Sequence, residues 1–264
     1  MPTAGSPAYF REEDGVFFGN DPARGPWSPE YCHAGPVTGL VVRALETAVG
    51  PQKVMTRLTL DVLRPLPLTG LVVSAEVERA TRTLSTTRFE VHHVDGTRCM
   101  AGTSMHLIRK DLGPVPTAEV VAPAFSDSET PSHGPIPVRH GQRCFGDFID
   151  VRVPRGSRDT IGPMTLWMRA PPLLEGEVPS PIQSICPLAD SGNGISWNAP
   201  PTVLGFMNTD LTIQIHREPV SDWLASQALS HWQGNGVGMS HSILHDTEGP
   251  VGVALQTLVL HPPG

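Results

Sequence analysis

Two seven-residue stretches of the chain are closely alike: Leu58-Thr59-Leu60-Asp61-Val62-Leu63-Arg64 and Leu211-Thr212-Ile213-Gln214-Ile215-His216-Arg217, which lie 153 positions apart. Each begins with the alternation of apolar and polar residues that is typical of a half-buried strand. The same offset aligns four further pairs: Leu71 with Leu224, Ala75 with Ala228, Gly96 with Gly249, and Ala101 with Ala254. A register kept across two expected hairpins favours duplication of one sheet unit.

The first half begins with one strong helical pattern and continues with period-two patterns. Apolar residues recur at Val37, Leu40, Val41, Ala44, Leu45 and Ala48. This spacing predicts a helix that lies against a flat surface, with Pro36 in its first turn and Gly50-Pro51 at its end. We then expect strands at 55–63, 71–79, 84–93 and 98–108, with Asp95-Gly96 as a hairpin turn. The outline is an antiparallel sheet wrapped around one helix.

A proline-rich segment separates the halves. Residues 111–142 carry Pro114, Pro116, Pro123, Pro131, Pro135 and Pro137 among small polar residues, which is the composition of a linker. We therefore predict a first unit at 1–110 and a second at 143–264. In the second unit we expect strands at 143–153 and 164–169, a weaker helix at 181–190, and four strands from Phe206 onward.

Composition narrows the classes of function. The formal net charge of −7 argues against nucleic-acid binding, which requires a basic surface. The cysteines, Cys32, Cys99, Cys144 and Cys186, form no Cys-x-x-Cys pair, so we expect free thiols and no metal site. The sequence shows neither a signal-peptide pattern nor an apolar run long enough for a membrane span. We therefore expect a cytoplasmic protein.

Short strings along both halves resemble, in order and spacing, those of the thioesterase-like superfamily, which contains bacterial acyl-CoA thioesterase II. They include Gly25-Pro26-Trp27, His33-Ala34-Gly35-Pro36, Arg43-Ala44-Leu45-Glu46, Leu188-Ala189-Asp190, Asn208-Thr209-Asp210, His216-Arg217-Glu218-Pro219, Leu244-His245-Asp246 and Ala254-Leu255-Gln256-Thr257. The resemblance implies an α+β double hotdog, in which two antiparallel sheets each wrap a helix and join into one continuous sheet. It also implies hydrolysis of acyl-CoA to a free acid and CoA, without a cofactor.

The resemblance carries a set of site residues with it. In thioesterase II a water molecule is activated by an Asp on the second helix, a Thr on a strand and a Gln on the last strand. The matching positions here are Asp190, Asn208 and Gln256. Asn208 departs from the family's Thr, and Thr209 cannot replace it without a register change because neighbours on a strand point to opposite faces.

The chemistry of thioester hydrolysis gives each of these residues a role. Asp190, partly desolvated against a sheet, is the expected base, and the carboxamides of Gln256 and Asn208 would orient the water. Backbone N–H groups near Gly35 and Gly192 could stabilise the oxyanion. We count His33, Gly35, Gly192 and Thr209 as candidate substrate-binding residues.

Structural interpretations stand beside these roles. Asp190 could form hydrogen bonds only to nearby amides at the helix end, and Gln256 could only form hydrogen bonds to an edge strand. Asn208 could start its strand through an Asx turn. His33 could be only a contact at the helix N-terminus. We interpret Asp210 and Arg217 as a structural pair or a surface feature.

Other functions remain open from the sequence. The replacement of Thr by Asn208 is compatible with a catalytically weak protein that binds acyl-CoA or another lipid. A hotdog hydratase or dehydratase is a third hypothesis, although its Asp-x-Asn-Pro-x-His string is absent. A serine hydrolase is unsupported because no Gly-x-Ser-x-Gly string occurs. We also expect a homo-oligomer, because sheet edges of this fold tend to pair.

Overall fold

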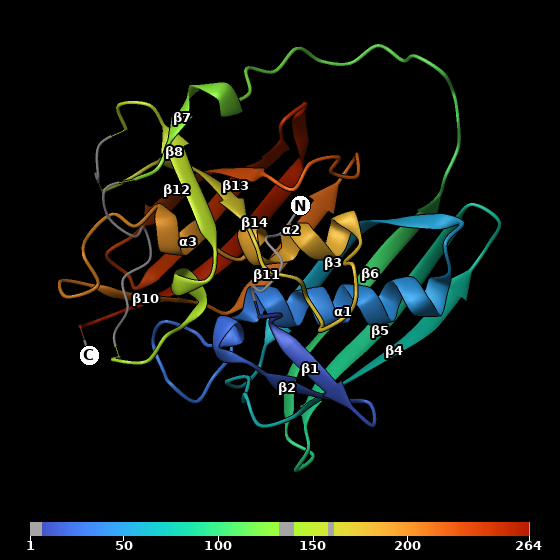
Figure 1. The fold of residues 1–264 in the computed structure, drawn as a ribbon, viewed down its shortest axis with the longest axis horizontal. Coiled ribbons are helices and arrows are strands. Elements are labelled where there is room, and N and C mark those ends of the chain that lie inside the picture. Colours follow the sequence, from blue (N-terminus) through green and yellow to red (C-terminus); the bar gives the residue numbers. More distant parts are fainter. Residues whose placement is uncertain (1–6, 132–139, 158–160, 264) are drawn as a thin grey trace.

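The computed structural model describes residues 7–131, 140–157 and 161–263, and it contains one continuous antiparallel sheet. Two helices, α1 (Ala34–Val49) and α2 (Pro181–Ala189), pack against each other beside the sheet (Figure 1). This arrangement confirms the predicted α+β class and the double hotdog. Both predicted helices are present: Pro36 lies in the first turn of α1, and α2 ends one residue before the expected bound.

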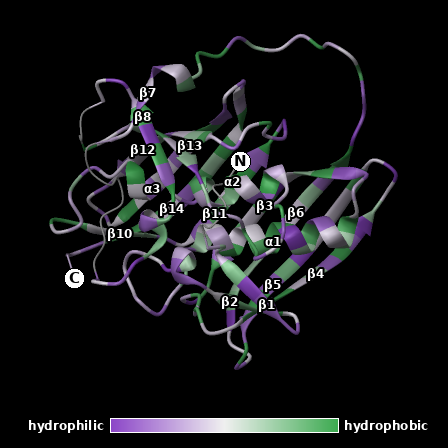
Figure 2. Cartoon of the chain, viewed as in Figure 1, coloured by the Kyte–Doolittle hydropathy of each residue, from purple (hydrophilic) through white to green (hydrophobic). Residues whose placement is uncertain are grey.

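The first half contributes six strands. They are β1 (Phe10–Glu13), β2 (Val16–Gly19), β3 (Lys53–Val62), β4 (Leu71–Ala80), β5 (Leu84–His93) and β6 (Arg98–Ile108), in the spatial order β1-β2-β4-β5-β6-β3. Hydrophobic and hydrophilic residues alternate along these strands, so one face meets α1 (Figure 2). The four expected strands are confirmed. The short β1 and β2, four residues each, were not predicted.

The second half continues the same sheet in the order β11-β14-β13-β12-β9-β8-β7, with β10 paired to β14. Its elements are β7 (Ser128–Glu129), β8 (Asp150–Pro154), β9 (Met164–Arg169), α3 (Gly192–Ile195), β10 (Gly205–Asn208), β11 (Asp210–Ile215), β12 (Leu224–Trp232), β13 (Val237–Asp246) and β14 (Gly249–His261). Four strands were expected from Phe206 onward, but five are present, because a bend at Thr209 separates β10 from β11.

The predicted strand at 143–153 is wrong in its first part. Residues Phe145–Asp147 form a short 3-10 helix, η3, and the strand begins only at Asp150. The Phe145 N–H donates to Arg24 O, outside the sheet, at 2.9 Å. This segment therefore packs on the loop that precedes α1, and its apolar residues are buried there instead of in a strand.

The proline-rich segment follows β6 and runs along the edge of the molecule (Figure 1). Residues 111–124 form no helix or strand, whereas a short 3-10 helix, η2 (Phe125–Asp127), and β7 follow before residue 132. Pro135 and Pro137 lie outside the described residues. The domain boundaries at 110 and 143 stay a prediction.

The two repeated heptapeptides form the seam between the halves. β3 and β11 pair antiparallel, and Leu60 faces Leu211 while Leu58 faces Ile213. Thr59 and Thr212, which are equivalent in the repeat, face each other, and the Thr212 hydroxyl donates to Thr59 Oγ1 at 3.3 Å. An approximate twofold axis therefore passes between them, and the repeat pairs with its own copy.

The gapless register predicted for the repeat is wrong in the last strand. Leu60 pairs with Gly102 and Ile213 pairs with Ala254, so Gly102, not Ala101, is equivalent to Ala254. The offset there is one residue shorter, because His92 pairs with Arg98 while His245 pairs with Pro250. The tighter second hairpin accounts for the difference.

The two helices meet through small residues. A Cβ added at Gly35 would lie 2.8 Å from Pro187 Cα, and one at Gly39 would lie 3.5 Å from Gln183 O and 2.9 Å from a methyl of Leu173, which precedes α2. Glycine at these positions therefore lets α1 approach α2 closely. Within the described residues, no helix has both the length and the apolar character needed to cross a membrane.

Candidate active site

Asp190 lies at the C-terminal end of α2, beside the N-terminus of α1. Ser180 caps the start of α2, with its hydroxyl accepting from the Gln183 N–H at 3.2 Å. The Asp190 N–H closes the last helical turn on Cys186 O. Asp190 itself is only 3% exposed, so its carboxylate depends on protein partners.

Two carboxamides from the second half donate to this carboxylate. Asn208 Nδ2 donates to Asp190 Oδ1 at 3.0 Å. Gln256 Nε2 donates to the same oxygen at 3.1 Å and to the Asp190 backbone carbonyl at 3.0 Å. The structure therefore brings together the three residues that the resemblance selected.

A β-bulge turns Asn208 toward Asp190. Asn208 pairs with Leu258 while Thr212 pairs with Leu255, so one extra residue lies on the β10–β11 side. Leu211, Ile213 and Ile215 point into the core, and simple alternation would point Thr209 inward and Asn208 outward. The bulge reverses this parity and places Asn208 on the same face as Leu258.

A third amide residue, Asn193, joins the network and was not predicted. Its backbone N–H donates to Gln256 Oε1 at 3.1 Å, and its side-chain Nδ2 donates to Asn208 Oδ1 at 3.4 Å. Asn193 lies in the single turn of α3. A sequence signal for Asn193 was available in Gly192-Asn193-Gly194, which directly follows Asp190-Ser191. A turn at these residues returns the chain toward Asp190.

His33 caps α1 and contacts Asp190 from the first half. Its Nδ1 lies 3.0 Å from Asp190 Oδ2 and 3.2 Å from the Gly35 N–H. The imidazole stacks on Phe145 with ring centroids 4.3 Å apart, and Trp27 lies 5.6 Å away on a tilted plane. The sequence predicted His33 near the substrate; its partner Phe145 was missed because 143–153 had been interpreted as strand.

The remaining predicted residues lie around this cluster with different surroundings. A Cβ at Gly192 would lie 2.7 Å from Ser242 Oγ and 3.3 Å from Gln256 Oε1, so this glycine allows α3 to pack on β13 and β14. The Gly35 N–H is occupied by His33. Thr209 makes backbone hydrogen bonds to Thr257 and Val62 at the bulge.

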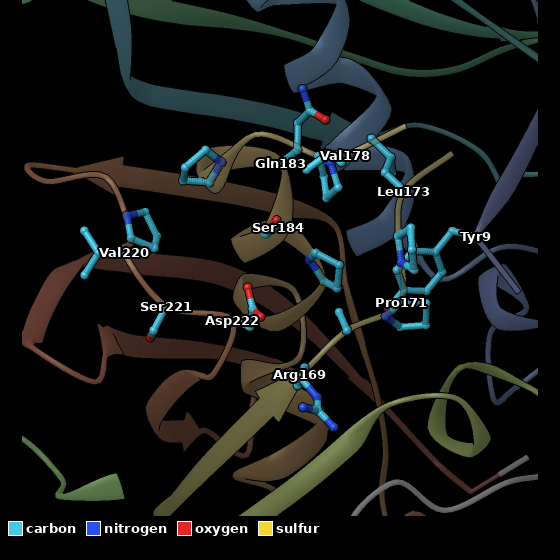
Figure 3. Close-up of a pocket in the computed structure, with 16 residues that line it drawn as sticks. Tyr9, Arg169, Pro171, Leu173, Val178, Gln183, Ser184, Val220, Ser221 and Asp222 are labelled. Atoms are coloured by element: carbon cyan, nitrogen blue, oxygen red, sulfur yellow. The ribbon is translucent and has the colours of Figure 1, made fainter. Parts of the chain in front are cut away.

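A surface cavity of about 400 Å³ adjoins the helix pair. Tyr9 and Leu173 lie on one side of it and Val220 on the other, with Ser184 of α2 between them (Figure 3). Its lining includes Gln183 and Pro187, and Asp190 follows them at helical spacing on the same face of α2. Tyr9 also stacks on Phe145 at 6.0 Å, which links the cavity to His33. Asp190 does not line the cavity.

The thiols near the site are poor nucleophiles. Burial raises the pKa of Cys186, on α2, and of Cys32, in the loop before α1, far above the usual range. Both therefore stay protonated, and all four cysteines are free, as expected. Among the described residues, no three His, Cys, Asp or Glu side chains gather as metal ligands would.

The interpretation of Asp210 and Arg217 as a pair is wrong. Asp210 Oδ1 accepts from the Thr257 N–H, whereas Arg217 forms a bidentate ion pair with Asp246, both bonds being 2.7 Å. Desolvation would raise the pKa of Asp246, but Arg217 and the N–H groups of Val220 and Glu248 lower it to about 2. This pair closes the β13–β14 hairpin and is structural.

The arrangement provides the elements of general-base chemistry. A buried carboxylate is held by amide donors on one oxygen and faces an imidazole with the other. Asn208 Nδ2 has a second hydrogen that can point to a water or an oxyanion. The cluster draws on both halves, since the first half supplies His33, the N-cap of α1, and the second half supplies the rest.

Family models match both halves of the chain. Residues 122–260 match the acyl-CoA thioesterase C-terminal domain, and residues 23–107 match the acyl-CoA thioesterase N-terminal domain. No curated protein sequence gives a significant match.

Solved structures with the same fold cover nearly the whole chain. A candidate thioesterase from Novosphingobium aromaticivorans is 20% identical, with 96% of this chain and 98% of that chain covered and a TM-score of 0.74. A protein with hot dog fold from Alicyclobacillus acidocaldarius is 14% identical, with 97% and 96% covered and a TM-score of 0.72. An acyl-CoA thioesterase II from Mycobacterium marinum is 17% identical, with 97% and 96% covered and a TM-score of 0.66. At these identities the likeness shows the fold alone.

Proposed function

Because this chain belongs to the acyl-CoA thioesterase family, a family of thioester hydrolases, we propose that it hydrolyses acyl-CoA to a free acid and CoA with a water activated by Asp190. The observation that carries the mechanism is the convergence of Asn208 Nδ2 and Gln256 Nε2 on Asp190 Oδ1. Two amide donors on one buried oxygen fix the orientation of a carboxylate that can accept a proton from water.

The proposed reaction begins with a water placed between Asp190 and the thioester carbonyl. The water oxygen bonds to the carbonyl carbon while Asp190 takes its proton, and the carbonyl oxygen becomes the oxyanion. The second N–H of Asn208 holds the water in place for this attack. The C–S bond then breaks with its electron pair on sulfur, and a proton converts the thiolate to the thiol. Gln256 keeps the Asp190 end of α2 joined to α3 through the Asn193 N–H.

The surface cavity is the proposed approach of the substrate. Its lining reaches Pro187, on the face of α2 that ends in Asp190, and is mainly proline and apolar residues, which suit an acyl chain or a pantetheine arm. Ser184→Trp would fill it, and we expect a higher KM with a smaller change in kcat. An unchanged KM would show that substrate reaches Asp190 by another path.

The decisive experiment compares the carboxylates at the two ends of the helix pair. Asp190→Asn keeps the shape but removes the base, and we expect kcat for thiol release to fall at least about 100-fold. Glu46→Gln is the matched control, because Glu46 bonds Ser180 and Gln183 at the other end of the helices. A panel of acyl-CoA substrates, assayed for free thiol, gives the preferred acyl group at the same time.

Two outcomes would overturn the proposal. An Asp190→Asn protein as active as the wild type would remove the mechanism. Tight binding of a non-hydrolysable acyl-CoA in calorimetry, without turnover of any substrate in the panel, would instead favour the acyl-CoA-binding hypothesis that the replacement of Thr by Asn208 raises.

A further inference from the structure

The N-caps of α1 and α2 make the same kind of contact with different chemistry. Ser180 caps α2 and donates its hydroxyl to Glu46 Oε1 at 2.8 Å, while it accepts from the Gln183 N–H. His33 caps α1, and its Nδ1 meets both the Gly35 N–H and Asp190 Oδ2. A hydroxyl can donate and accept at once, whereas one imidazole nitrogen can do only one of these.

This limit on Nδ1 determines where a proton can lie. A bare Nδ1 can accept from Gly35, but its lone pair then faces a carboxylate oxygen at 3.0 Å, which is repulsive unless Asp190 carries the proton. A protonated Nδ1 can donate to Asp190, but the Gly35 N–H then loses its cap. In either state one proton lies between Nδ1 and Oδ2.

We propose that His33 and Asp190 act as one proton-sharing pair in the hydrolysis proposed above, with His33 as a positioning residue that acts through Asp190. The proton that the pair shares at rest moves from Asp190 Oδ2 to His33 Nδ1 as the Gly35 cap opens, and Asp190 then takes a proton from the water. When the C–S bond breaks, Asp190 gives the water's proton to the CoA sulfur, and the shared proton returns from Nδ1 to Asp190. Water and thioester thus give acid and thiol, with no proton left over.

The surroundings of His33 hold the pair in place. Phe145 stacks on the imidazole with planes 14° apart, and Trp27 covers it from another side. A stacked ring with a buried edge keeps Nδ1 directed at Asp190. The contact joins the two halves, since His33 precedes α1 and Asp190 ends α2.

The other titratable or charged groups on the elements that pack around His33 either bond to other partners or are buried thiols. Two of these groups are buried thiols: Cys186 lies on α2, and Cys32 lies in the loop that contains His33. Arg24 in this loop bonds Asp21 and the Arg143 carbonyl. In η3, the Asp147 carboxylate accepts from the Cys144 N–H, and burial raises the pKa of the Cys144 thiol. Asp190 is therefore the charged group in direct contact with the imidazole.

The test replaces His33 by a residue that keeps the cap. His33→Asn retains a strong N-cap for Gly35 but cannot exchange a proton. We expect kcat/KM to fall about 10- to 100-fold, less than for loss of the base, and the pH profile of kcat/KM to lose the limb that the pair contributes. Glu46→Gln should leave the shape of the profile unchanged.

A spectroscopic readout tests the pair without turnover. In protein labelled with ¹⁵N-histidine, the Nδ1 signal of His33 should change with pH together with Asp190, and Asp190→Asn should abolish this coupling. A His33→Asn profile of wild-type shape, or a His33 signal that ignores Asp190→Asn, would overturn proton sharing. Failure of the wild type to release thiol would instead overturn the proposed hydrolysis, and the spectrum would still decide on the pair.

Discussion

The two halves of the molecule have a β-bulge at equivalent positions, but they differ in the side chains beside the bulge. In the first half the bulge at Thr56 places Met55 opposite His106, and in the second the bulge at Thr209 places Asn208 opposite Leu258. The corrected register also makes Ser104 equivalent to Gln256. Ser104 bonds the Thr87 hydroxyl at 2.5 Å and His106 Nε2 at 2.7 Å, within the sheet.

This difference shows that the backbone alone does not make a site. Met55 and Ser104 stay within the core of the first half, whereas Asn208 and Gln256 reach a carboxylate at the end of a helix. The same bulge therefore serves packing in one copy and the proposed chemistry in the other. Exchanging side chains between equivalent positions is the direct way to test the comparison.

The largest expected effect comes from giving the second half the serine of the first. Gln256→Ser is too short to reach both Asp190 and the Asn193 N–H, so we expect kcat to fall about 100-fold or more. The control is Ser104→Ala, which should leave thiol release unchanged. Loss of turnover in the control would show that Ser104, in the sheet of the first half, also takes part in catalysis, which would contradict the difference between the two copies.

The next effect concerns His106, whose equivalent in the second half is Leu258. Burial, with a smaller contribution from Lys53, lowers the pKa of His106 from 6.5 to about 4. Between these two values the unfolded chain binds a proton on His106 that the folded chain does not bind. The neutral imidazole therefore favours the folded state above pH 6.5, and this contribution to stability is lost as pH falls toward 4. The loss is roughly 3 kcal/mol.

The measurement is urea unfolding of wild type and His106→Leu between pH 7 and 4.5. The free energy of unfolding should decrease in both proteins as the pH falls, and we expect the decrease to be about 2 kcal/mol smaller in the variant. Parallel pH dependences in the two proteins would contradict the buried neutral imidazole.

A third difference lies at the hairpin ends, where Arg217 pairs with Asp246 and the equivalent residues are Arg64 and His93. With the pKa of Asp246 lowered to about 2, the pair stabilises the fold above pH 4, and its contribution is lost as pH falls toward 2. Asp246→Asn should lower the free energy of unfolding at pH 7 by about 2 kcal/mol. His93→Asn, the matched change in the first half, should cost less than about 1 kcal/mol in the same urea titration.

The smallest expected effect comes from Asn208. Asn208→Met copies the first half and removes one donor to Asp190, so we expect kcat to fall about 10-fold with little change in melting temperature. Asn208→Thr, which restores the residue type of the related thioesterases, should lose less. A threonine variant that is less active than the methionine variant would show that the hydroxyl cannot replace the carboxamide here.

Much of the fold was predictable because its signals are local. The stripe from Val37 to Ala48 predicted α1, and alternation predicted β3 to β6 almost to the residue. The position of Asp190 at the end of a helix also followed from the pattern. By contrast, Phe145 lies in a stretch that alternates like a strand, and its burial against His33 depends on the Arg24 loop, which is distant in sequence.

The candidate site was predictable only as a list of residues. The resemblance selected Asp190, Asn208 and Gln256, but no local rule predicted that a bulge at Thr209 would turn Asn208 inward. Asn193 was missed because its role depends on the single turn of α3 returning the chain to Gln256. A one-residue shift in a strand reverses every side chain, and such shifts depend on the pairing partner.

The sequence by itself determined the duplication and the helix-then-strands order of each half, because these depend on periods of two and 3.6 residues, and its resemblance to thioesterase II selected the residues of the candidate site. The tertiary structure decided that a bulge turns Asn208 toward Asp190 and that His33 of one half meets Asp190 of the other. Bulges, hairpin lengths and helix contacts set those outcomes, and they arise from pairing between segments far apart in the chain.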